Sequence, residues 1–583
     1  MGHTPKAKID SVMIVEPLAR IRAGLEVTLQ QGGYRTIMSD GTGVLEMIED
    51  EVPDVVLLSC HWERAPSDGF DLCKQIVADE IAAAVVLTSS NATKELVIRA
   101  VRAGAKNFVV TPANGPALCP KLEQAFSQTP LAESRAKFPI VRFGSRHLSN
   151  GQKVDIIMRD AATIRVLPQA VAGVLHVTSQ GDTGAQDVAR AVGSDPTIAA
   201  MVLKLANSAF YGAGEPVADI ETAVVRMGFR ECRDQVIGLA TANLFPRNDK
   251  SFGFNRIWYW IHSLACGLLA EQIARRVSFD DKKNAFTTGL LHDLGKIVLD
   301  DFLIGPYGQV VRKAHTDAIT MSEAEQVLLE RDHAQVGGAI TAKWRFPECV
   351  SEAIANHHKY DKLIADASPS LAGAVSLADI MTKALLIGSA GDFIVPNTPT
   401  SAWARYNCED LSFHALLDLL YEQLREFCEV FSISEEQVDV ALDRDYDSGT
   451  AVLYDPQDKN RLLLSMFLVN QGFDVTAPDC VADIGSIEEA PQLCVIWPTD
   501  SGEALCVCEM IESHAAGPWP TICIAEHDSL ADEIRNGRDW LRIVRAPLDC
   551  FTLLIEAREL LPDILKATII AHGGHRPEPV ATV

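Results

Sequence analysis

The sequence predicts a multidomain protein in which two α/β doubly wound domains flank an all-α domain. Residues 11 to 127 and 451 to 562 each alternate short β-branched runs with helical patterns, which is typical of βαβ units on a parallel sheet. Residues 156 to 442 follow a helical pattern throughout. A chain of 583 residues is also too long for one hydrophobic core.

The predicted domains follow one another along the chain. The first α/β domain covers residues 8–128, and a polar linker at 129–155 leads to the all-α domain at 156–442. In that domain Asp195 and Pro196 start a helix with one apolar stripe, and residues 388–401 read as a long loop. A linker at 443–450 precedes the second α/β domain at 451–570, and residues 571–583 are expected to form a flexible tail.

Composition and charge limit the function. Apolar residues make up 48% and charged residues 22%, the balance of ordinary globular protein. A formal charge of −26 repels nucleic acid and anionic membranes, so neither is expected as a partner. We find no signal peptide and no run of about 18 uncharged apolar residues. Fourteen scattered Cys without a C-x-x-C pair fit reduced thiols, and we expect a cytoplasmic protein.

The two α/β segments also resemble each other, which indicates an internal repeat. Aligning Glu16-Pro17 with Asp455-Pro456 matches Arg22 with Arg461, Leu25 with Leu464, Leu29 with Leu468, Gly33 with Gly472 and Tyr34 with Phe473. A repeat of this kind implies two copies of one fold on either side of the helical region.

Both segments resemble response-regulator receiver domains, which have a flavodoxin-like fold. That family carries an acidic pair after the first strand, a phosphate-accepting Asp at the end of the third, Thr or Ser at the end of the fourth and Lys before Pro in the fifth. The carboxylates hold Mg²⁺, while the Lys and the hydroxyl neutralise the phosphoryl group.

The residues at these positions predict receivers that cannot be phosphorylated. The first copy has Glu16-Pro17, Ser59, Thr88 and Thr111-Pro112, and the second has Asp455-Pro456, Trp497, Ala525 and Ala546-Pro547. Ser59 and Trp497 stand at the phosphoacceptor positions. We expect degenerate receivers that serve as docking or dimerising surfaces. The alternative is a pair of doubly wound domains that bind a small ligand at their strand ends.

The helical region resembles the HDOD family, a branch of the HD superfamily. The resemblance rests on the ordered segments LPQAVAGVLHVT, DPTIAAMVLKLANSAFYG, ETAVVRMGF, WYWIHSLACGLLAEQIA, FTTGLLHDLGKIVL, DHAQVGGAITAKWRFPECVSEAIANHH and AGAVSLADIM. It implies an all-α HD-superfamily domain. Members of the family are mostly regarded as signalling modules.

Seven side chains of this region form a candidate metal site: His262, His292, Asp293, His333, His357, His358 and Asp379. Apolar residues surround several of them, and a charged or titrating group in such surroundings needs a partner or a metal. Imidazole and carboxylate ligands suit Fe, Mn or Zn without selecting among them. The alternative is a helical core in which these residues only hydrogen-bond one another.

The resemblance to HD-superfamily phosphohydrolases implies that His262, His292, Asp293 and Asp379 hold one divalent ion. Resemblance to the HD-GYP branch implies a second ion at His333, His357 and His358, with Asp293 as a bridge. In an enzyme, Asp293 and Lys296 would be catalytic, Lys296 by neutralising charge on phosphate. Lys296 as a solvated lysine is the alternative, and the segment HHKYDKLIADASP lacks the GYP of that branch.

The predicted function is that of a bacterial-type signal-transduction regulator of the two-component kind. Its HDOD domain would bind signalling proteins, or a cyclic nucleotide or other phosphate ligand, and its receiver-like domains would dock partners or form a homodimer. The alternative is a metal-dependent phosphodiesterase or phosphohydrolase that acts on cyclic (di)nucleotides through the His/Asp set.

Overall fold

The structure is a computed structural model, and it describes residues 9–128, 148–164, 171–174, 184–244, 255–430, 433 and 448–561. Gaps within these ranges lie at 10, 52, 61–68, 79–83, 112, 114, 172, 208–210, 212–216, 366–367, 410–412, 528–529, 532–533 and 535–537. The predicted tail at 571–583 and most of both predicted linkers therefore lie outside the described residues.

The chain divides into two compact units. One consists of Met1–Arg165 with Lys250–Phe252 and Leu299–Val310, and the other of Val166–Asp249, Gly253–Val298 and Val311–Val583. The first unit contains the N-terminal sheet. The second contains most of the helical domain and the C-terminal sheet.

The N-terminal sheet has five parallel strands, β1 (Ser11–Val15), β2 (Arg35–Ser39), β3 (Val55–Ser59), β4 (Ala84–Ser89) and β5 (Asn107–Val110). Their order is β2-β1-β3-β4-β5. The central strands β1, β3 and β4 are buried along their whole length, which explains why their sequences are continuous apolar runs rather than alternating ones. This is the predicted doubly wound arrangement.

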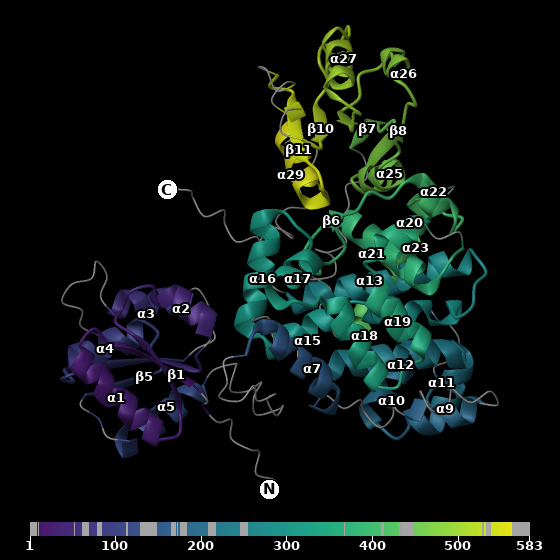
Figure 1. Cartoon of the computed structure of the whole chain (residues 1–583). Coiled ribbons are helices and arrows are strands. Elements are labelled where there is room, and N and C mark those ends of the chain that lie inside the picture. The colour runs from purple at the N-terminus through teal and green to yellow at the C-terminus, as the bar shows by residue number, and fades with distance from the viewer. Residues whose placement is uncertain are drawn as a thin grey trace. The chain divides into compact units, whose positions relative to one another are not determined.

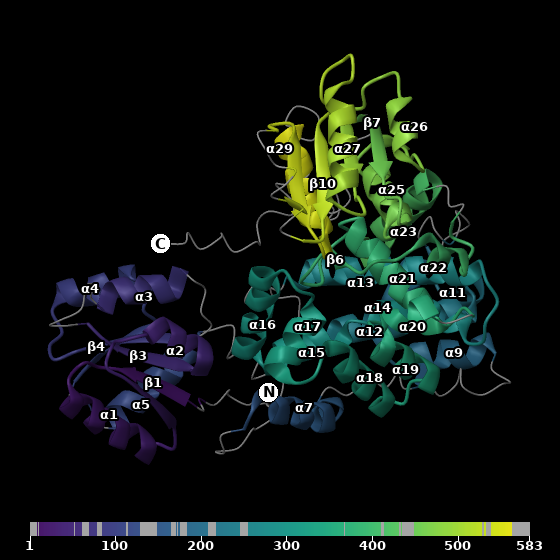
Figure 2. The same cartoon turned by 45° about the horizontal axis from the view of Figure 1, so that its top comes forward.

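Helices cover both faces of this sheet, as Figures 1 and 2 show. One face carries α1 (Ala19–Gln31) and α5 (Gly115–Phe126), and the other carries α2 (Val44–Glu51), α3 (Gly69–Ala78) and α4 (Lys94–Arg102). Each face has its own apolar cluster, with Leu29 and Leu122 in the first and Ile48 and Ile76 in the second. A further helix, α7 (Asn150–Ile164), begins inside the segment predicted as a linker.

In the described part of the helical domain, helices are joined by turns and loops and by one two-residue strand. The helices are α9 (Ala185–Val192), α10 (Pro196–Ala206), α11 (Ile220–Met227), α12 (Phe229–Leu244), α13 (Arg256–Arg275), α14 (Ala285–Leu291), α15 (Leu294–Phe302), α16 (Ile304–Asp317), α17 (Met321–Leu329), α18 (His333–Lys343), α19 (Glu348–Asn356), α20 (Tyr360–Ala365), α21 (Leu371–Ala384), α22 (Thr400–Ala404) and α23 (Phe413–Val430). A single 3-10 turn, Lys282–Asn284, precedes α14.

Helix α13 is the centre of this domain and packs against α14, α21 and α23. Its first turn is capped by Asn255, whose side chain accepts hydrogen bonds from the backbone N–H groups of Ile257 and Trp258. An uninterrupted stretch of α13, Tyr259 to Ala270, is buried. Because a helix buried on all sides cannot be amphipathic, its sequence is apolar nearly throughout.

The segment predicted as a long loop at 388–401 connects α21 to α22. It contains a two-residue strand, β6 (Ile394–Val395), and its last residues begin α22. Strand β6 pairs in antiparallel fashion with β12 (Leu548–Asp549), which lies far away in the sequence. The loop therefore joins the helical domain to the C-terminal region.

The C-terminal region contains a second parallel sheet with the same strand order as the first. Its strands are β7 (Gly449–Tyr454), β8 (Phe473–Thr476), β9 (Leu493–Ile496), β10 (Thr521–Ala525) and β11 (Leu541–Arg545), in the order β11-β10-β9-β7-β8. The surrounding helices are α25 (Arg461–Asn470), α26 (Val481–Gly485), α27 (Ser501–Glu512) and α29 (Cys550–Leu560). Two α/β sheets and a helical domain thus make up the predicted multidomain fold.

Residues aligned in the internal repeat occupy equivalent places. Gly33 and Gly472 follow the first helix of their sheets with φ of 85° and 84°, a backbone conformation that favours glycine. Arg22 donates a hydrogen bond to the carbonyl of Glu16, and Arg461 does the same to the carbonyl of Asp455. The two sheets therefore share local structure as well as strand order.

Among the helices that the structure describes, none has both the length and the hydropathy needed to span a bilayer.

Candidate metal centre

The seven predicted ligands lie on five separate elements and converge. His262 lies in the middle of α13, the His292-Asp293 pair forms the turn between α14 and α15, and Asp379 lies on α21. His333 begins α18, and His357 with His358 ends α19. Six of these side chains are at most 1% exposed, and His358 is partly buried.

One group of ligand atoms forms around His262, His292 and Asp293. The Nε2 atoms of His262 and His292 lie 3.7 and 3.4 Å from Oδ2 of Asp293. Asp379 also approaches both rings, with Oδ1 3.2 Å from His262 Nε2 and 3.6 Å from His292 Nε2. Ligands at about 2.1 Å from one ion are separated by about 3.0–3.4 Å. Two of these distances lie in that range and the other two slightly exceed it, so small side-chain shifts would fit the group to one cation.

A second group forms around His333, His357, His358 and Asp293. The Nε2 atoms of His333 and His357 lie 3.0 and 3.7 Å from Oδ1 of Asp293. The Nε2 atoms of His333 and His358 are 2.7 Å apart. Asp293 therefore turns one carboxylate oxygen toward each group, which is the geometry of a bridging ligand.

Several of the atoms that face one another lack hydrogen-bond partners. Among the buried side-chain atoms left without a partner are Nε2 of His262, His292 and His357, Oδ1 of Asp293 and both oxygens of Asp379. Several of these atoms are close enough for a hydrogen bond but do not have its geometry. Buried polar atoms are seldom left unsatisfied, so the residues fit a metal centre better than a hydrogen-bonded core.

The other ring nitrogens are held by fixed acceptors. Nδ1 of His292 lies 2.6 Å from the Gly289 carbonyl, and Nδ1 of His357 lies 2.6 Å from the Ile354 carbonyl. A carbonyl can only accept, so in the neutral ring each Nδ1 carries the proton, which leaves the Nε2 lone pair available for a ligand role. Nδ1 of His333 has the same relation to a carboxylate oxygen of Glu325, at 2.6 Å.

Glycine at position 295 allows the second group to form. A methyl group added to Gly295 would lie 2.0 Å from the His333 carbonyl oxygen. The start of α15 and the start of α18 therefore approach more closely than any side chain permits, which brings His333 next to Asp293.

Two buried lysines accompany the carboxylates. Nζ of Lys296 lies 2.8 Å from Oδ2 of Asp293. Nζ of Lys383 lies 3.5 Å from Oδ2 of Asp379 and 3.1 Å from Oδ1 of Asp392. Lys296 is fully buried, which excludes the alternative of a solvated lysine. The lysine instead neutralises a carboxylate of the centre.

These contacts shift the pKa values of the two carboxyl groups. Burial alone would raise the pKa of Asp293, but His292 and Lys296 bring it well below its usual value. Burial opposes ionisation of Asp379 too, and Lys383 with His262 brings its pKa well below the usual value. Both groups are therefore carboxylates at neutral pH, the form that binds cations.

The imidazoles divide into two classes. Burial lowers the pKa of His357 to about 4 and that of His358 well below its usual value. Burial also lowers the pKa values of His292 and His333, but nearby carboxylates outweigh it. Asp293 raises the pKa of His292 well above its usual value, and Glu325 with Asp293 raises that of His333 to about 9. The carboxylates thus favour positive charge on these two rings, a charge that a bound cation would replace.

Sequence reasoning did not identify the residues that support the ligands. Lys383 follows Asp379 by one helical turn, which is a detectable signal. Glu325 and Asp392 carry no such signal, because their contacts with His333 and Lys383 arise from tertiary packing.

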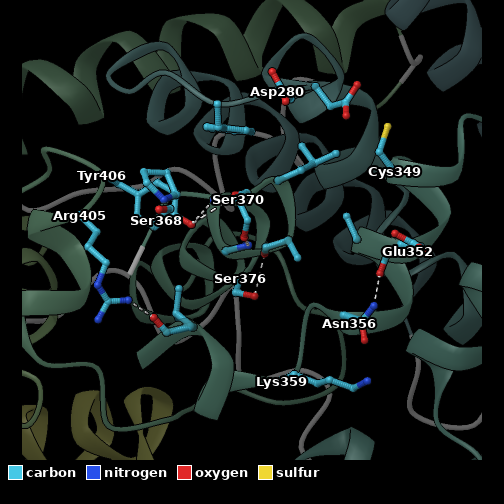
Figure 3. A pocket seen from close by; sticks show the side chains of 18 of the residues that line it. Asp280, Cys349, Glu352, Asn356, Lys359, Ser368, Ser370, Ser376, Arg405 and Tyr406 are labelled. Carbon is cyan, nitrogen blue, oxygen red and sulfur yellow. Dashed lines mark hydrogen bonds between the residues drawn. The ribbon is translucent and has the colours of Figure 1, made fainter. Parts of the chain in front are cut away.

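A cavity of about 800 Å³ lies beside the centre, between residues 278–281, α19, α20 and α21. Figure 3 shows Ser370 and Ser376 toward its middle, with Arg405 at the left, Lys359 at the bottom, Glu352 at the right and Asp280 at the top. Ser376 donates a hydrogen bond to the carbonyl of His357 at 2.5 Å. The cavity wall is thereby attached to one of the predicted ligands.

The strand ends of the two sheets hold the remaining predicted positions. In the N-terminal sheet Ser59 ends β3 and pairs in register with Thr88 of β4, and both are buried. In the C-terminal sheet Trp497 follows β9 and is fully buried, with the ammonium of Lys459 5.6 Å from its ring centre. Neither position holds a carboxylate.

Comparison with known families assigns two parts of the chain. Residues 164–360 match the HDOD domain, and residues 12–123 match the response regulator receiver domain. The chain contains an HDOD domain and a receiver domain. The presence of these two domains confirms both predictions. For the C-terminal sheet the structure establishes a parallel α/β architecture.

Individual relatives match parts of the chain. An uncharacterized protein of Treponema pallidum is 24% identical over 33% of this chain, and the transcriptional regulatory protein PdtaR of Mycobacterium tuberculosis is 35% identical over 20%. The matches span 37% and 57% of those two proteins. An HDOD domain protein from Geobacter sulfurreducens, solved as a crystal structure, is 24% identical over 49% of this chain and 97% of its own, with a TM-score of 0.38.

An HDOD domain combined with a receiver domain fits a signal-transduction regulator.

Proposed function

We propose that this regulator uses its HDOD domain as a metal-stabilised signalling module that acts by binding rather than by catalysis. The observation that carries the proposal is the set of buried, unpartnered nitrogen and oxygen atoms that face one another around Asp293. A cation would satisfy these atoms together. It would also connect α13, α18, α19 and α21 with the turn that carries Asp293.

One or two divalent ions would be held by His262, His292, Asp293 and Asp379, and by His333, His357 and His358 with Asp293. Imidazole and carboxylate donors fit Fe, Mn or Zn. The bound ions would supply positive charge to a site where Lys296 and Lys383 already neutralise part of the carboxylate charge.

Burial favours binding over turnover. The ligands from His262 to Asp379 are nearly all inaccessible, whereas a hydrolytic centre needs a coordination position that water and substrate can reach. The phosphodiesterase function remains the second candidate, because the Asp293 bridge is the arrangement that two-metal catalysis requires.

The cavity beside α21 is our candidate site for a cyclic nucleotide or another phosphate ligand. Its volume is in the range of small-molecule sites. Lys359 and Arg405 supply positive charge on its lining, although Arg405 already donates to the Leu363 carbonyl.

The two α/β parts would serve as docking modules of a cytoplasmic protein. Ser59 and Trp497 leave neither sheet with a phosphate-accepting Asp at the third strand, and we propose the C-terminal sheet as a second, degenerate receiver. Helix α4 exposes Val97, Ile98 and Val101, an apolar surface suited to a signalling partner or a second copy of the chain.

Metal analysis of the purified full chain tests the centre. We expect at least one equivalent of a transition metal in the wild type, and a loss of most of it in Asp293→Ala, which removes the shared ligand. Asp317→Ala, at an exposed ion pair outside the centre, is the matched control and should keep the metal. Equal metal content in wild type and Asp293→Ala would refute the site.

A turnover assay separates the two candidate functions. The metal-loaded wild type is incubated with cyclic dinucleotides and with a simple phosphodiester. We expect no product above that formed by His292→Ala. Product formed by the wild type and lost in both His292→Ala and Asp293→Ala would establish the phosphodiesterase instead.

A further inference from the structure

Lys383 belongs to two ion pairs at once. Its Nζ lies 3.5 Å from the metal-site carboxylate of Asp379 and 3.1 Å from Asp392. All three side chains are buried, so water screens these interactions little. The position of the ammonium group therefore depends on the charge of the metal centre.

Asp392 in turn holds the segment that follows α21. Its Oδ1 accepts a hydrogen bond from the Ile394 backbone N–H at 3.2 Å, and its Oδ2 accepts one from the Met321 N–H at 2.9 Å. Residues 386–400, which we call the strap, are thus fixed to α17 through the same carboxylate that pairs with Lys383.

The strap also contacts His262 of the metal centre. A methyl group added to Gly388 would lie 2.4 Å from the His262 backbone nitrogen, and Gly388 has a φ of 65°. Next to it, Ser389 donates a hydrogen bond to the Trp258 carbonyl at 3.0 Å. The strap therefore lies against the helix that carries one predicted ligand and is ion-paired, through Lys383, to another.

The far end of the strap binds the C-terminal sheet. Strand β6 pairs with β12, and the Phe393 ring stacks on Phe551 at a centroid distance of 5.6 Å. The Thr398 N–H is 2.8 Å from Oδ1 of Asn460, and Asp458 accepts hydrogen bonds from the backbone N–H and the hydroxyl of Thr400. Asp458 and Asn460 follow β7, so this is the carboxyl edge of the sheet.

We propose that Lys383 and Asp392 are positioning residues that couple occupancy of the metal centre to docking of the C-terminal sheet. The inference rests on the metal centre proposed above. A cation bound to Asp379 repels the Lys383 ammonium group and shifts it toward Asp392. The tighter Lys383–Asp392 pair then stabilises the strap and its β6–β12 pairing.

Coupling of this kind is reciprocal. If the metal stabilises docking by a given factor, docking strengthens metal binding by the same factor. A substitution at the C-terminal edge, remote from every ligand, should therefore weaken the metal site.

Hydrogen exchange of the full chain tests the coupling, with Zn²⁺ as the probe added to chelator-treated protein. In the wild type we expect Zn²⁺ to slow exchange of peptides that contain 394–395 and 548–549 at least fivefold. In Asp392→Asn the slowing should fall below twofold, and Zn²⁺ affinity should drop correspondingly. Asp479→Asn, an exposed carboxylate in the same region, is the control and should match the wild type.

A second variant tests the coupling without changing the residues around Asp392. Asp458→Ala leaves the Lys383–Asp392 pair intact and removes the contacts to Thr400. We expect a fall of about fivefold in Zn²⁺ affinity, at the lower end of the usual range of coupling factors. Unchanged affinity in Asp458→Ala, or equal slowing in wild type and Asp392→Asn, would overturn the coupling.

The two proposals fail in different ways. Zn²⁺ that binds with no difference between wild type and Asp293→Ala would refute the metal centre, and the coupling with it. Zn²⁺ that needs Asp293 but leaves the exchange of β6 and β12 unchanged would refute the coupling alone.

Discussion

The two α/β sheets share a strand order but differ at their carboxyl edges. In the N-terminal sheet this edge holds the small polar side chains of Ser59 and Thr88. In the C-terminal sheet the corresponding position after β9 holds Trp497, and the loop after β7 binds the strap of the helical domain. The same topology thus presents a small polar edge in one copy and an apolar, internally bound edge in the other.

This difference indicates that the carboxyl edges of the two sheets have different roles. An edge that is filled by a large aromatic side chain and bound to the strap has become part of the protein's own packing. Paired substitutions, one at each edge, measure how far the two copies have diverged.

The largest effect is expected at Trp497, because its side chain is fully buried. Trp497→Ala should destabilise the C-terminal sheet by about 3–5 kcal/mol through lost apolar contacts and a cavity. Hydrogen exchange of β9 and β10 amides measures this. Ser59→Ala, at the matched position, should change the stability of the N-terminal sheet by less than about 1 kcal/mol. Equal effects would contradict the proposed divergence of the edges.

The two arginines of the repeat should behave alike. Arg22→Ala and Arg461→Ala each remove a hydrogen bond to the carbonyl that ends the first strand, with an expected cost of about 1–2 kcal/mol. Urea unfolding followed by exchange of β1 and β7 amides gives both values. A loss of stability in only one copy would show that the arginine hydrogen bond no longer stabilises both sheets.

A smaller loss of stability is expected from Asp458→Ala, and Asp40→Ala in the N-terminal sheet is the comparison. Both side chains accept hydrogen bonds from the backbone and the hydroxyl of a threonine, but Asp458 binds the distant Thr400 and Asp40 binds the adjacent Thr42. Asp458→Ala should cost about 1 kcal/mol and speed exchange of β12. Asp40→Ala should alter only its own loop, and faster β12 exchange there would argue against a specific role of Asp458.

The last prediction is that neither sheet can be phosphorylated. A small phosphodonor with Mg²⁺ should add no stable phosphate to the full chain, since Ser59 and Trp497 replace the acceptor Asp in both copies. Intact mass spectrometry measures this, with an unrelated phosphorylatable receiver as a positive control. A phosphorylated residue mapped to either sheet would show that the strand-end positions are misassigned.

Much of the fold could be predicted from the sequence because its signals are local. Continuous apolar strands, a helical middle and the repeated Arg22 and Gly33 positions all follow from short-range patterns. The strap could not be predicted in this way. The sequence predicts a loop at 388–401. It does not predict that Ile394 pairs with Asp549, because no local pattern connects these two residues.

The seven candidate ligands could be predicted because His and Asp are conspicuous in apolar surroundings, and the structure brings all seven side chains together. Their supporting residues were harder to find. For Lys383 the sequence offers only its spacing of one helical turn from Asp379. Glu325 has the sequence pattern of a solvated acid, although it is fully buried against His333. Such roles depend on which helices meet, and that information is spread over the whole domain.

Because Asp293 alone supplies an oxygen to each of the two ligand groups, the groups cannot be inherited separately. A descendant that lost this side chain would be released from selection on all six other ligands at once. Among relatives, we therefore expect the complete set or its widespread erosion, with few intermediate sequences between them.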